Sequence, residues 1–136
     1  MKEAPKKIDH IGIAVKSIEE HLPFYEEVLG LTLLKVEEVE SQKVKVAFIE
    51  IGSSKLELLE PLADTSPIAS FIEKKGEGIH HIALGVSDIN QRLEEIRQDG
   101  IQTLSEEAYK GAGGADVAFL HPRSTGRVLY EFCEKK

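Results

Sequence analysis

The sequence has little cysteine, fewer basic than acidic residues and no long apolar run. Its one cysteine, Cys133, excludes an internal disulfide. Lysine and arginine number 17 against 24 aspartates and glutamates, so the net charge is −7, which argues against a nucleic-acid or anionic-membrane partner. Because no apolar stretch is long enough to span a bilayer or to serve as a secretory signal, we expect a cytoplasmic protein.

What remains is the composition of an ordinary globular protein. Hydrophobic residues make up 41% of the chain and charged residues 30%. With 136 residues the chain can bury a substantial core, and we expect a single domain spanning residues 1–136.

Two similar stretches organise the chain: IDHIGIAV at residues 8–15 and IHHIALGV at residues 79–86. His81 falls on His10 at an offset of 81 − 10 = 71 residues. Read as strands, each stretch has a bulky apolar face, suited to packing beneath a helix, and a face with one histidine followed by two very small residues. We interpret the second face as the wall of a cavity.

The surrounding pattern repeats as well, so the sequence predicts an α+β fold of two tandem βαβββ modules. The modules span about residues 7–61 and 78–134, are joined by a short helical linker, and form an eight-stranded barrel-like cleft with the helices outside. Pro23 predicts an irregularity in the first helix, and the KGAGG stretch at residues 110–114 predicts a flexible loop. Ser17 and Asp88 are the expected N-caps of the two module helices. The expected strands are 8–15, 31–39, 44–51, 55–60, 79–86, 101–105, 115–121 and 127–133, and the expected helices are 16–29, 67–75 and 88–100.

Each module offers a histidine on its first strand and a glutamate on its last: His10 with Glu57, and His81 with Glu131. The glutamates correspond at an offset of 131 − 57 = 74 residues. Taken alone, a strand histidine is more often a hydrogen-bonded core residue, and a mid-strand glutamate can face solvent. Because four such residues occupy equivalent places, the repeat favours a site for Zn, Co, Ni, Mn or Fe. Four protein ligands would leave an octahedral ion two adjacent positions for substrate oxygens.

The other histidines have structural interpretations. His80 falls on the face opposite to His81, where a hydrogen bond on the helix side is expected. His21, in the first helix, and His121, before Pro122, are expected at the surface or behind the site.

Longer motifs carry a family resemblance. FYEEVLGL at residues 24–31 is similar to a phrase common in the vicinal-oxygen-chelate superfamily, which includes glyoxalase I and extradiol dioxygenases. More specific motifs resemble the methylmalonyl-CoA epimerase family over nearly the whole chain. They are KLELLEP (55–61), SPIASFI (66–72), GIHHIALGV (78–86), LSEEAYKGAGG (104–114) and VAFLHPRSTGRVLYE (117–131).

The resemblance implies a glyoxalase-like fold and one divalent ion per chain, with Co, Zn, Ni and Mn as candidates. The family's metal ligands fall on the same four residues, His10, Glu57, His81 and Glu131. It also implies a homodimer that acts on methylmalonyl-CoA or a similar acyl thioester.

The implied reaction interconverts the R and S forms of methylmalonyl-CoA by removing the α-proton and returning it to the other face, through an enolate stabilised by the metal. Glu131 is the first candidate base. The resemblance implies that some family members use a glutamate at the position of Val46, so Glu57 is the candidate for the second base here. Glu50, nearer the strand end, is interpreted as a surface residue. Lys110, Arg123 and Arg127 are the basic residues expected near the cleft mouth, where they could hold CoA phosphates.

Other functions remain open at this point. A glyoxalase I-type isomerase (lactoylglutathione lyase) would use the same metal on a glutathione hemithioacetal. A metal-free ligand-sequestering protein would not need four convergent ligands. An extradiol dioxygenase is disfavoured by the fourth ligand and by the short chain.

Overall fold

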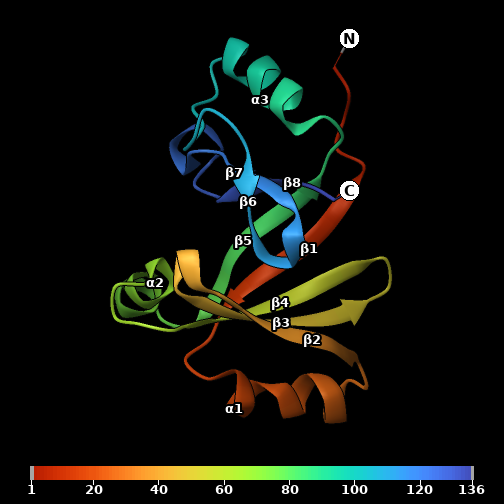
Figure 1. Cartoon of the computed structure of the whole chain (residues 1–136), viewed down its shortest axis with the longest axis vertical. Coiled ribbons are helices and arrows are strands. Elements are labelled where there is room, and N and C mark those ends of the chain that lie inside the picture. Colours follow the sequence, from red (N-terminus) through yellow and green to blue (C-terminus); the bar gives the residue numbers. More distant parts are fainter. Residues whose placement is uncertain (1, 136) are drawn as a thin grey trace. The chain divides into compact units, whose positions relative to one another are not determined.

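The computed structural model describes residues 2–135, so the predicted domain limits, residues 1 and 136, lie outside the described part. Within it, three α-helices and eight strands are present (Figure 1). None of these helices is both long and apolar enough to cross a membrane. The elements are β1 (Lys7–Ala14), α1 (Ile18–Pro23), η1 (Phe24–Val28), β2 (Thr32–Val39), η2 (Glu40–Gln42), β3 (Val44–Ile51), β4 (Ser54–Pro61), α2 (Pro67–Lys75), β5 (Gly78–Gly85), α3 (Ile89–Gln98), β6 (Tyr109–Lys110), η3 (Ala112–Gly114), β7 (Asp116–Phe119), η4 (Pro122–Ser124) and β8 (Tyr130–Glu134).

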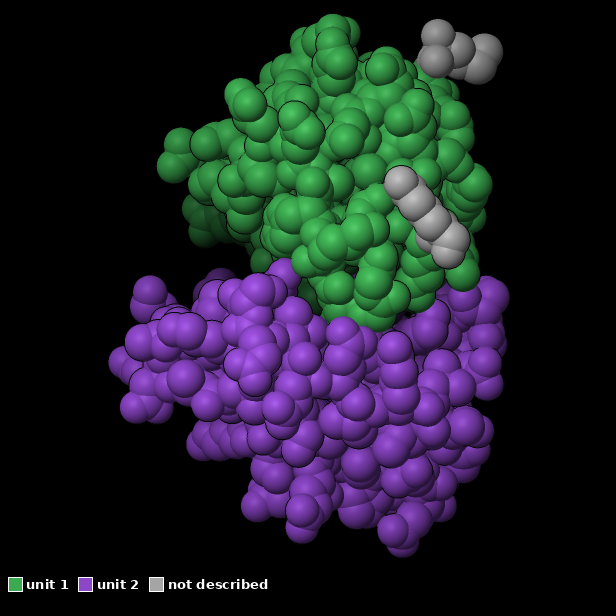
Figure 2. All heavy atoms as spheres, viewed as in Figure 1, with its two compact units in different colours: residues 1–9, 81–136 green, residues 10–80 purple. Residues whose placement is uncertain are grey.

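The chain divides into two compact units, coloured separately in Figure 2. Unit 2 comprises residues 10–80, and unit 1 comprises residues 1–9 and 81–136. Unit 2 contains the linker helix α2 in addition to most of the first predicted module, whereas residues 7–9 of β1 belong to unit 1. The predicted α+β fold class with two βαβββ modules and eight strands is confirmed. That the modules make one domain stays a prediction.

In unit 2 the strands are hydrogen-bonded in the order β2-β3-β4-β1, and α1 packs on one face of this sheet (Figure 1). The contact buries Val15 and Ile18 against Ala47, Ile49 and Leu58. The bulky face of the first repeated strand therefore lies beneath a helix, as predicted. The Ser17 hydroxyl accepts a hydrogen bond from the Glu20 N–H, so the predicted N-cap is confirmed.

The first helix is irregular after Pro23, as predicted. α1 ends there, and the chain continues as one π-helical turn, η1, in which the Leu29 N–H donates to the Phe24 carbonyl. Proline cannot donate a backbone hydrogen bond, and its ring crowds the preceding turn, so the regular α-helical pattern is interrupted.

In unit 1 the order is β5-β8-β7-β6, and α3 packs on one face of these strands (Figure 1). Ile89 and Leu93 of α3 contact Ala118 and Phe132, with Leu84 packed at the edge of the cluster. The second repeated strand thus also turns its bulky face to a helix. The N-terminal end of β1 joins this unit, where the Lys6 N–H donates to the Gly85 carbonyl.

The predicted strand at residues 101–105 is wrong. Only Thr103 forms a bridge there, with Leu120, and the edge strand is instead β6, which begins just before the predicted 110–114 loop. Side chains explain the difference: Arg97 donates to the Thr103 hydroxyl and to the Glu106 carbonyl, and Thr103 donates to the Ser105 carbonyl. Such local hydrogen bonds compete with strand pairing.

Asp88 occupies the predicted N-cap position of α3 but makes no side-chain cap, and the predicted start of the last strand is wrong. Asp88 does not cap α3 with its side chain, because its backbone is left-handed (φ 50°); the Glu134 carboxylate accepts from the N–H groups of Asp88 and Ile89 instead. The last strand begins at Tyr130 and not at Arg127. Arg127 has φ 72° and its N–H donates to the Pro122 carbonyl, so it completes the turn.

Candidate metal centre and active site

Unit 2 holds a buried imidazole–carboxylate pair formed by His10 and Glu57. His10 lies on β1 and Glu57 on β4, and parallel pairing places Gly12 beside Glu57, so both side chains share one face. The His10 Nδ1 atom lies 3.2 Å from the Glu57 Oε2 atom, and each side chain is 6% exposed. A carboxylate buried to this degree requires a partner charge or a cation.

Unit 1 repeats the arrangement with His81 on β5 and Glu131 on β8. Pairing of Ala83 with Glu131 puts the two side chains on one face. The His81 Nε2 atom lies 3.1 Å from the Glu131 Oε1 atom, again with both side chains 6% exposed. The His81 and Phe119 rings pack edge to face with their centroids 5.4 Å apart, and this contact helps to orient the imidazole. Each module therefore buries one imidazole beside one carboxylate, at equivalent positions on its first and last strands.

The separations within the pairs suit two ligands of one ion. Two ligand atoms that bind one ion at 90° to each other, with bonds of about 2.1 Å, lie about 3 Å apart. The separations of 3.2 Å and 3.1 Å within the two pairs are close to this value, and the same distances also permit a hydrogen bond from imidazole to carboxylate. The donor set of each pair, one nitrogen and one oxygen, is one that Zn, Co, Ni and Mn accept.

Val46, the residue predicted to match the second base of some family members, is apolar and buried. Val46 lies on β3 opposite Leu59 of β4, with 1% of its surface exposed, and two residues along the strand Phe48 lies opposite Glu57. Glu50 is exposed at the end of β3, which agrees with the surface interpretation. Among the acidic groups weighed for the second base, only Glu57 is buried on this face.

The three predicted phosphate contacts are all at the surface. The Lys110 Nζ atom lies 2.8 Å from Asp116 Oδ1, so its charge is partly neutralised. Arg123 and Arg127 are exposed around the turn before β8. Their role in substrate binding stays a prediction.

The remaining histidines have structural partners. The rings of His80 and of Phe71 on α2 pack edge to face, with their centroids 4.9 Å apart. The His21 Nε2 atom lies 2.9 Å from Glu77 Oε2, and His121 Nδ1 accepts a hydrogen bond from the Arg123 N–H. None of these three contacts involves a predicted metal ligand.

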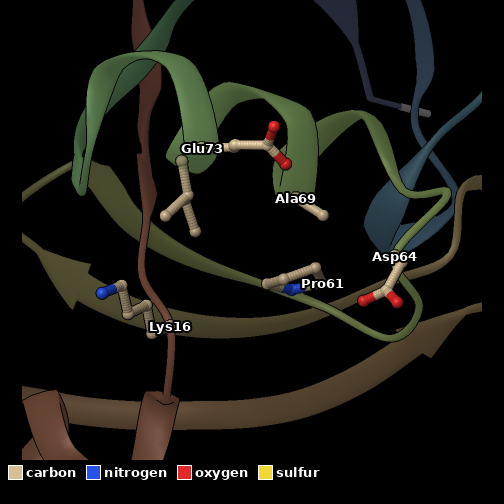
Figure 3. Close-up of a pocket in the computed structure, with 6 residues that line it drawn as sticks. Lys16, Pro61, Asp64, Ala69 and Glu73 are labelled. Carbon is tan, nitrogen blue, oxygen red and sulfur yellow. The ribbon is translucent and has the colours of Figure 1, made fainter.

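Unit 2 also has an open pocket of about 520 Å³ beside α2, shown in Figure 3. In the figure, Ala69 and Glu73 project from α2, with Lys16 and Asp64 on the segments facing the helix. One ammonium and two carboxylates give the lining a net negative charge, so CoA phosphates would be repelled. The lining residues are Lys16, Pro61, Asp64, Ala69, Ile72 and Glu73, and none is a predicted site residue.

Sequence reasoning missed one aromatic residue beside Glu131. Burial raises the pKa of Tyr109, and the negative charge of Glu131 raises it further. Tyr109 lies on β6, a strand of two residues, which is too short for side-chain alternation to reveal.

Comparison with known proteins now decides the family. Residues 9–119 match the Glyoxalase/Bleomycin resistance protein/Dioxygenase superfamily. The chain is 40% identical over 126 residues to the mitochondrial methylmalonyl-CoA epimerase of Homo sapiens, covering 92% of this chain and 72% of that protein. It is 37% identical to the ethylmalonyl-CoA/methylmalonyl-CoA epimerase of Cereibacter sphaeroides, covering 92% and 95% of the two chains. The chain belongs to the methylmalonyl-CoA epimerase family of this superfamily.

A solved structure agrees with this assignment. A variant of Streptomyces coelicolor methylmalonyl-CoA epimerase, in complex with 2-nitronate-propionyl-CoA, superposes with a TM-score of 0.93 at 35% identity. The match covers 97% of this chain and 96% of that one. The predictions of a glyoxalase-like fold and of an epimerase are confirmed.

Proposed function

We propose that this member of the epimerase family interconverts the R and S forms of methylmalonyl-CoA, with one divalent ion held by His10, Glu57, His81 and Glu131. The observation that carries the proposal is the repeated pair: each unit buries a histidine and a glutamate about 3 Å apart, at equivalent strand positions. The family supports the substrate, since a solved relative is a methylmalonyl-CoA epimerase in complex with methylmalonyl-CoA.

The repeat is the reason to assign the four residues to a single ion. A lone pair offers one nitrogen and one oxygen, which is too few ligands for tight binding of a first-row divalent metal. Two pairs together offer two nitrogens and two oxygens. An octahedral ion held by these four ligands keeps two positions for substrate oxygens. Bound there, a divalent ion would lower the free energy of the enolate by offsetting the charge that develops on the thioester oxygen.

Glu131 and Glu57 carry out the two proton transfers. Glu131 as carboxylate accepts the proton from the carbon between the thioester and the free carboxylate, and the C–H electron pair enters the enolate. Glu57 in its acid form returns a proton to the opposite face, so the two glutamates exchange protonation states and the substrate is inverted. Because Val46 cannot carry a proton, Glu57 is the buried carboxyl group available for this second step.

We assign the CoA phosphates to the exposed basic residues of unit 1. Arg123 and Arg127 lie around one turn, and neither forms an ion pair with an acidic side chain among residues 2–135, so they are the stronger phosphate contacts. Lys110 is the weaker one, because Asp116 already balances its charge.

Deuterium uptake tests the function. The purified protein, with its bound metal measured, is mixed with methylmalonyl-CoA in D₂O, with and without chelator, and the α-deuterium content is followed by mass spectrometry. We expect uptake with metal, loss of uptake after chelation, and recovery when the metal is restored. A parallel sample receives the hemithioacetal of methylglyoxal and glutathione. Turnover of that compound alone would favour the glyoxalase alternative, and no uptake by metal-loaded protein would reject the epimerase.

We further propose that the protein is a cytoplasmic homodimer. The support is the family resemblance and the absence of any helix within residues 2–135 that could cross a membrane. Light scattering coupled to size exclusion would give about twice 15.1 kDa for the dimer. A mass of one chain would contradict it.

A further inference from the structure

Tyr109 lies on the same sheet face as the metal-ligand candidates of unit 1. In the antiparallel strands β6, β7 and β8, Tyr109 pairs with Val117, and Val117 pairs with Cys133. Residues directly opposite one another in antiparallel strands point to the same face. Glu131, two residues from Cys133, shares that face, so the phenol and the Glu131 carboxylate project to one side.

Burial on this face increases from the edge strand β6 to the inner strands β7 and β8. Tyr109 is 41% exposed, whereas Val117, Cys133 and Glu131 are each at most 5% exposed. Lys110, the next residue along β6, projects to the opposite face, where it pairs with Asp116. Tyr109 therefore lies at the solvent-exposed edge of the same sheet face on which His81 and Glu131 are buried.

The Tyr109 hydroxyl is available to a ligand. Among residues 2–135, none forms a hydrogen bond with it, although Glu131 is close enough for its charge to raise the pKa of the phenol. A tyrosine phenol has an ordinary pKa of about 10, so it is a neutral hydrogen-bond donor at physiological pH. It can hold an anionic group beside Glu131 without adding another ion to the site.

We propose that the Tyr109 hydroxyl donates a hydrogen bond to the free carboxylate of the acyl thioester. This inference rests on the proposed function. The substrate carboxylate is charged throughout the reaction and is repelled by Glu131, whereas the thioester oxygen becomes charged only in the enolate. A hydrogen bond from the Tyr109 hydroxyl, at the edge of the sheet beside Glu131, therefore stabilises the substrate carboxylate most strongly. This makes Tyr109 a specificity residue for acyl thioesters that carry a second acid group.

The test compares Tyr109→Phe with Tyr130→Phe in the metal-loaded protein. Both variants lose one hydroxyl and keep the ring, but Tyr130 packs in the cluster beneath α3, on the other face of the same module. Calorimetry measures the affinity for methylmalonyl-CoA and for propionyl-CoA, which lacks the free carboxylate, and deuterium uptake gives kcat and KM. We expect Tyr109→Phe to weaken methylmalonyl-CoA binding and raise KM by roughly tenfold. Propionyl-CoA affinity should change less than about twofold.

The outcomes separate this inference from the proposed function. If wild-type protein takes up deuterium and Tyr109→Phe binds methylmalonyl-CoA as tightly as wild type does, the inference alone fails. Equal weakening of both thioesters would also overturn it, because the lost contact would then belong to the shared CoA portion. If wild-type protein neither binds nor deuterates methylmalonyl-CoA, the proposed function fails and the inference fails with it. Tyr130→Phe should match wild type throughout; a loss equal to that of Tyr109→Phe would mean a general effect on the module and would overturn the assignment.

Discussion

The Glu60 carboxylate accepts a hydrogen bond from the backbone N–H of Ile18, with Oε1 2.8 Å from the nitrogen. The second module repeats this contact between Glu134 and the N–H of Ile89, at 3.0 Å. The offsets are 134 − 60 = 74 and 89 − 18 = 71, the same two that relate the metal-ligand candidates. In each module the glutamate lies three residues after the candidate ligand, so it ties the ligand strand to the start of the module helix.

Removing Glu134 should destabilise the protein more than removing Asp88. Glu134→Ala leaves two N–H groups at the start of α3 without their carboxylate partner, and we expect a loss of about 1–2 kcal/mol in the free energy of unfolding. Asp88→Ala removes no side-chain cap and should cost less. Urea unfolding of both variants measures this, and a larger loss for Asp88→Ala would contradict the assignment of Glu134 as the cap.

Replacing a histidine of either pair should remove metal and activity together. His10→Ala and His81→Ala each take one nitrogen from the proposed ion, and we expect metal affinity to fall about 100-fold or more. Metal analysis after dialysis, with deuterium uptake on the same samples, measures both quantities. His21→Ala is the matched control, because His21 contacts Glu77 and neither pair. Full metal occupancy in either pair variant would remove that histidine from the ligand set.

Glu131→Gln should lower turnover more than metal content. The amide keeps an oxygen for the ion but cannot accept the substrate proton, so we expect kcat to fall about 100-fold or more. Glu57→Gln is the parallel variant and tests the second base in the same way. Turnover per bound metal ion is the quantity to compare. If it stays at the wild-type value, the glutamate serves as a ligand only.

Glu77 should make stability depend on pH in the acid range. The Lys16 N–H, and then His21, hold the pKa of this carboxyl below its ordinary value of 4.5. A lowered pKa in the folded state means that the contribution is present above the unfolded pKa and is lost as pH falls through the folded pKa. We expect Glu77→Gln to cost roughly 0.5–1 kcal/mol at pH 7, since Glu77 is about a third exposed and screened by solvent.

Thermal unfolding of Glu77→Gln and wild type across pH 2–7 checks this expectation. The two proteins should converge in stability at the acid end, because the wild-type carboxyl is then protonated as well. A difference that persists unchanged at low pH would show that the carboxylate charge is not the source of the stabilisation.

Patterns that extend over many residues predicted the helices and strands correctly, whereas predictions from single residues or short segments account for the errors. Period-two alternation around His10 and His81 predicted both strands and the face that each turns to a helix, since these patterns extend over eight residues. Asp88 occupies the N-cap position that its residue type favours, but the carboxylate of Glu134, from a distant part of the chain, accepts the N–H hydrogen bonds in its place. The predicted 101–105 strand failed because the Arg97 and Thr103 side chains donate hydrogen bonds to nearby backbone carbonyls.

The sequence by itself determined the duplicated modules, the four candidate ligands and the Pro23 irregularity, because spacing, alternation and the missing proline N–H act along the chain. Only the tertiary structure decided that each histidine lies about 3 Å from the glutamate of its own module, that Lys110 is already paired with Asp116, and that Tyr109 shares a face with Glu131. These relationships depend on strand register between segments distant in sequence. Register is set by packing of the whole sheet, which no local pattern contains.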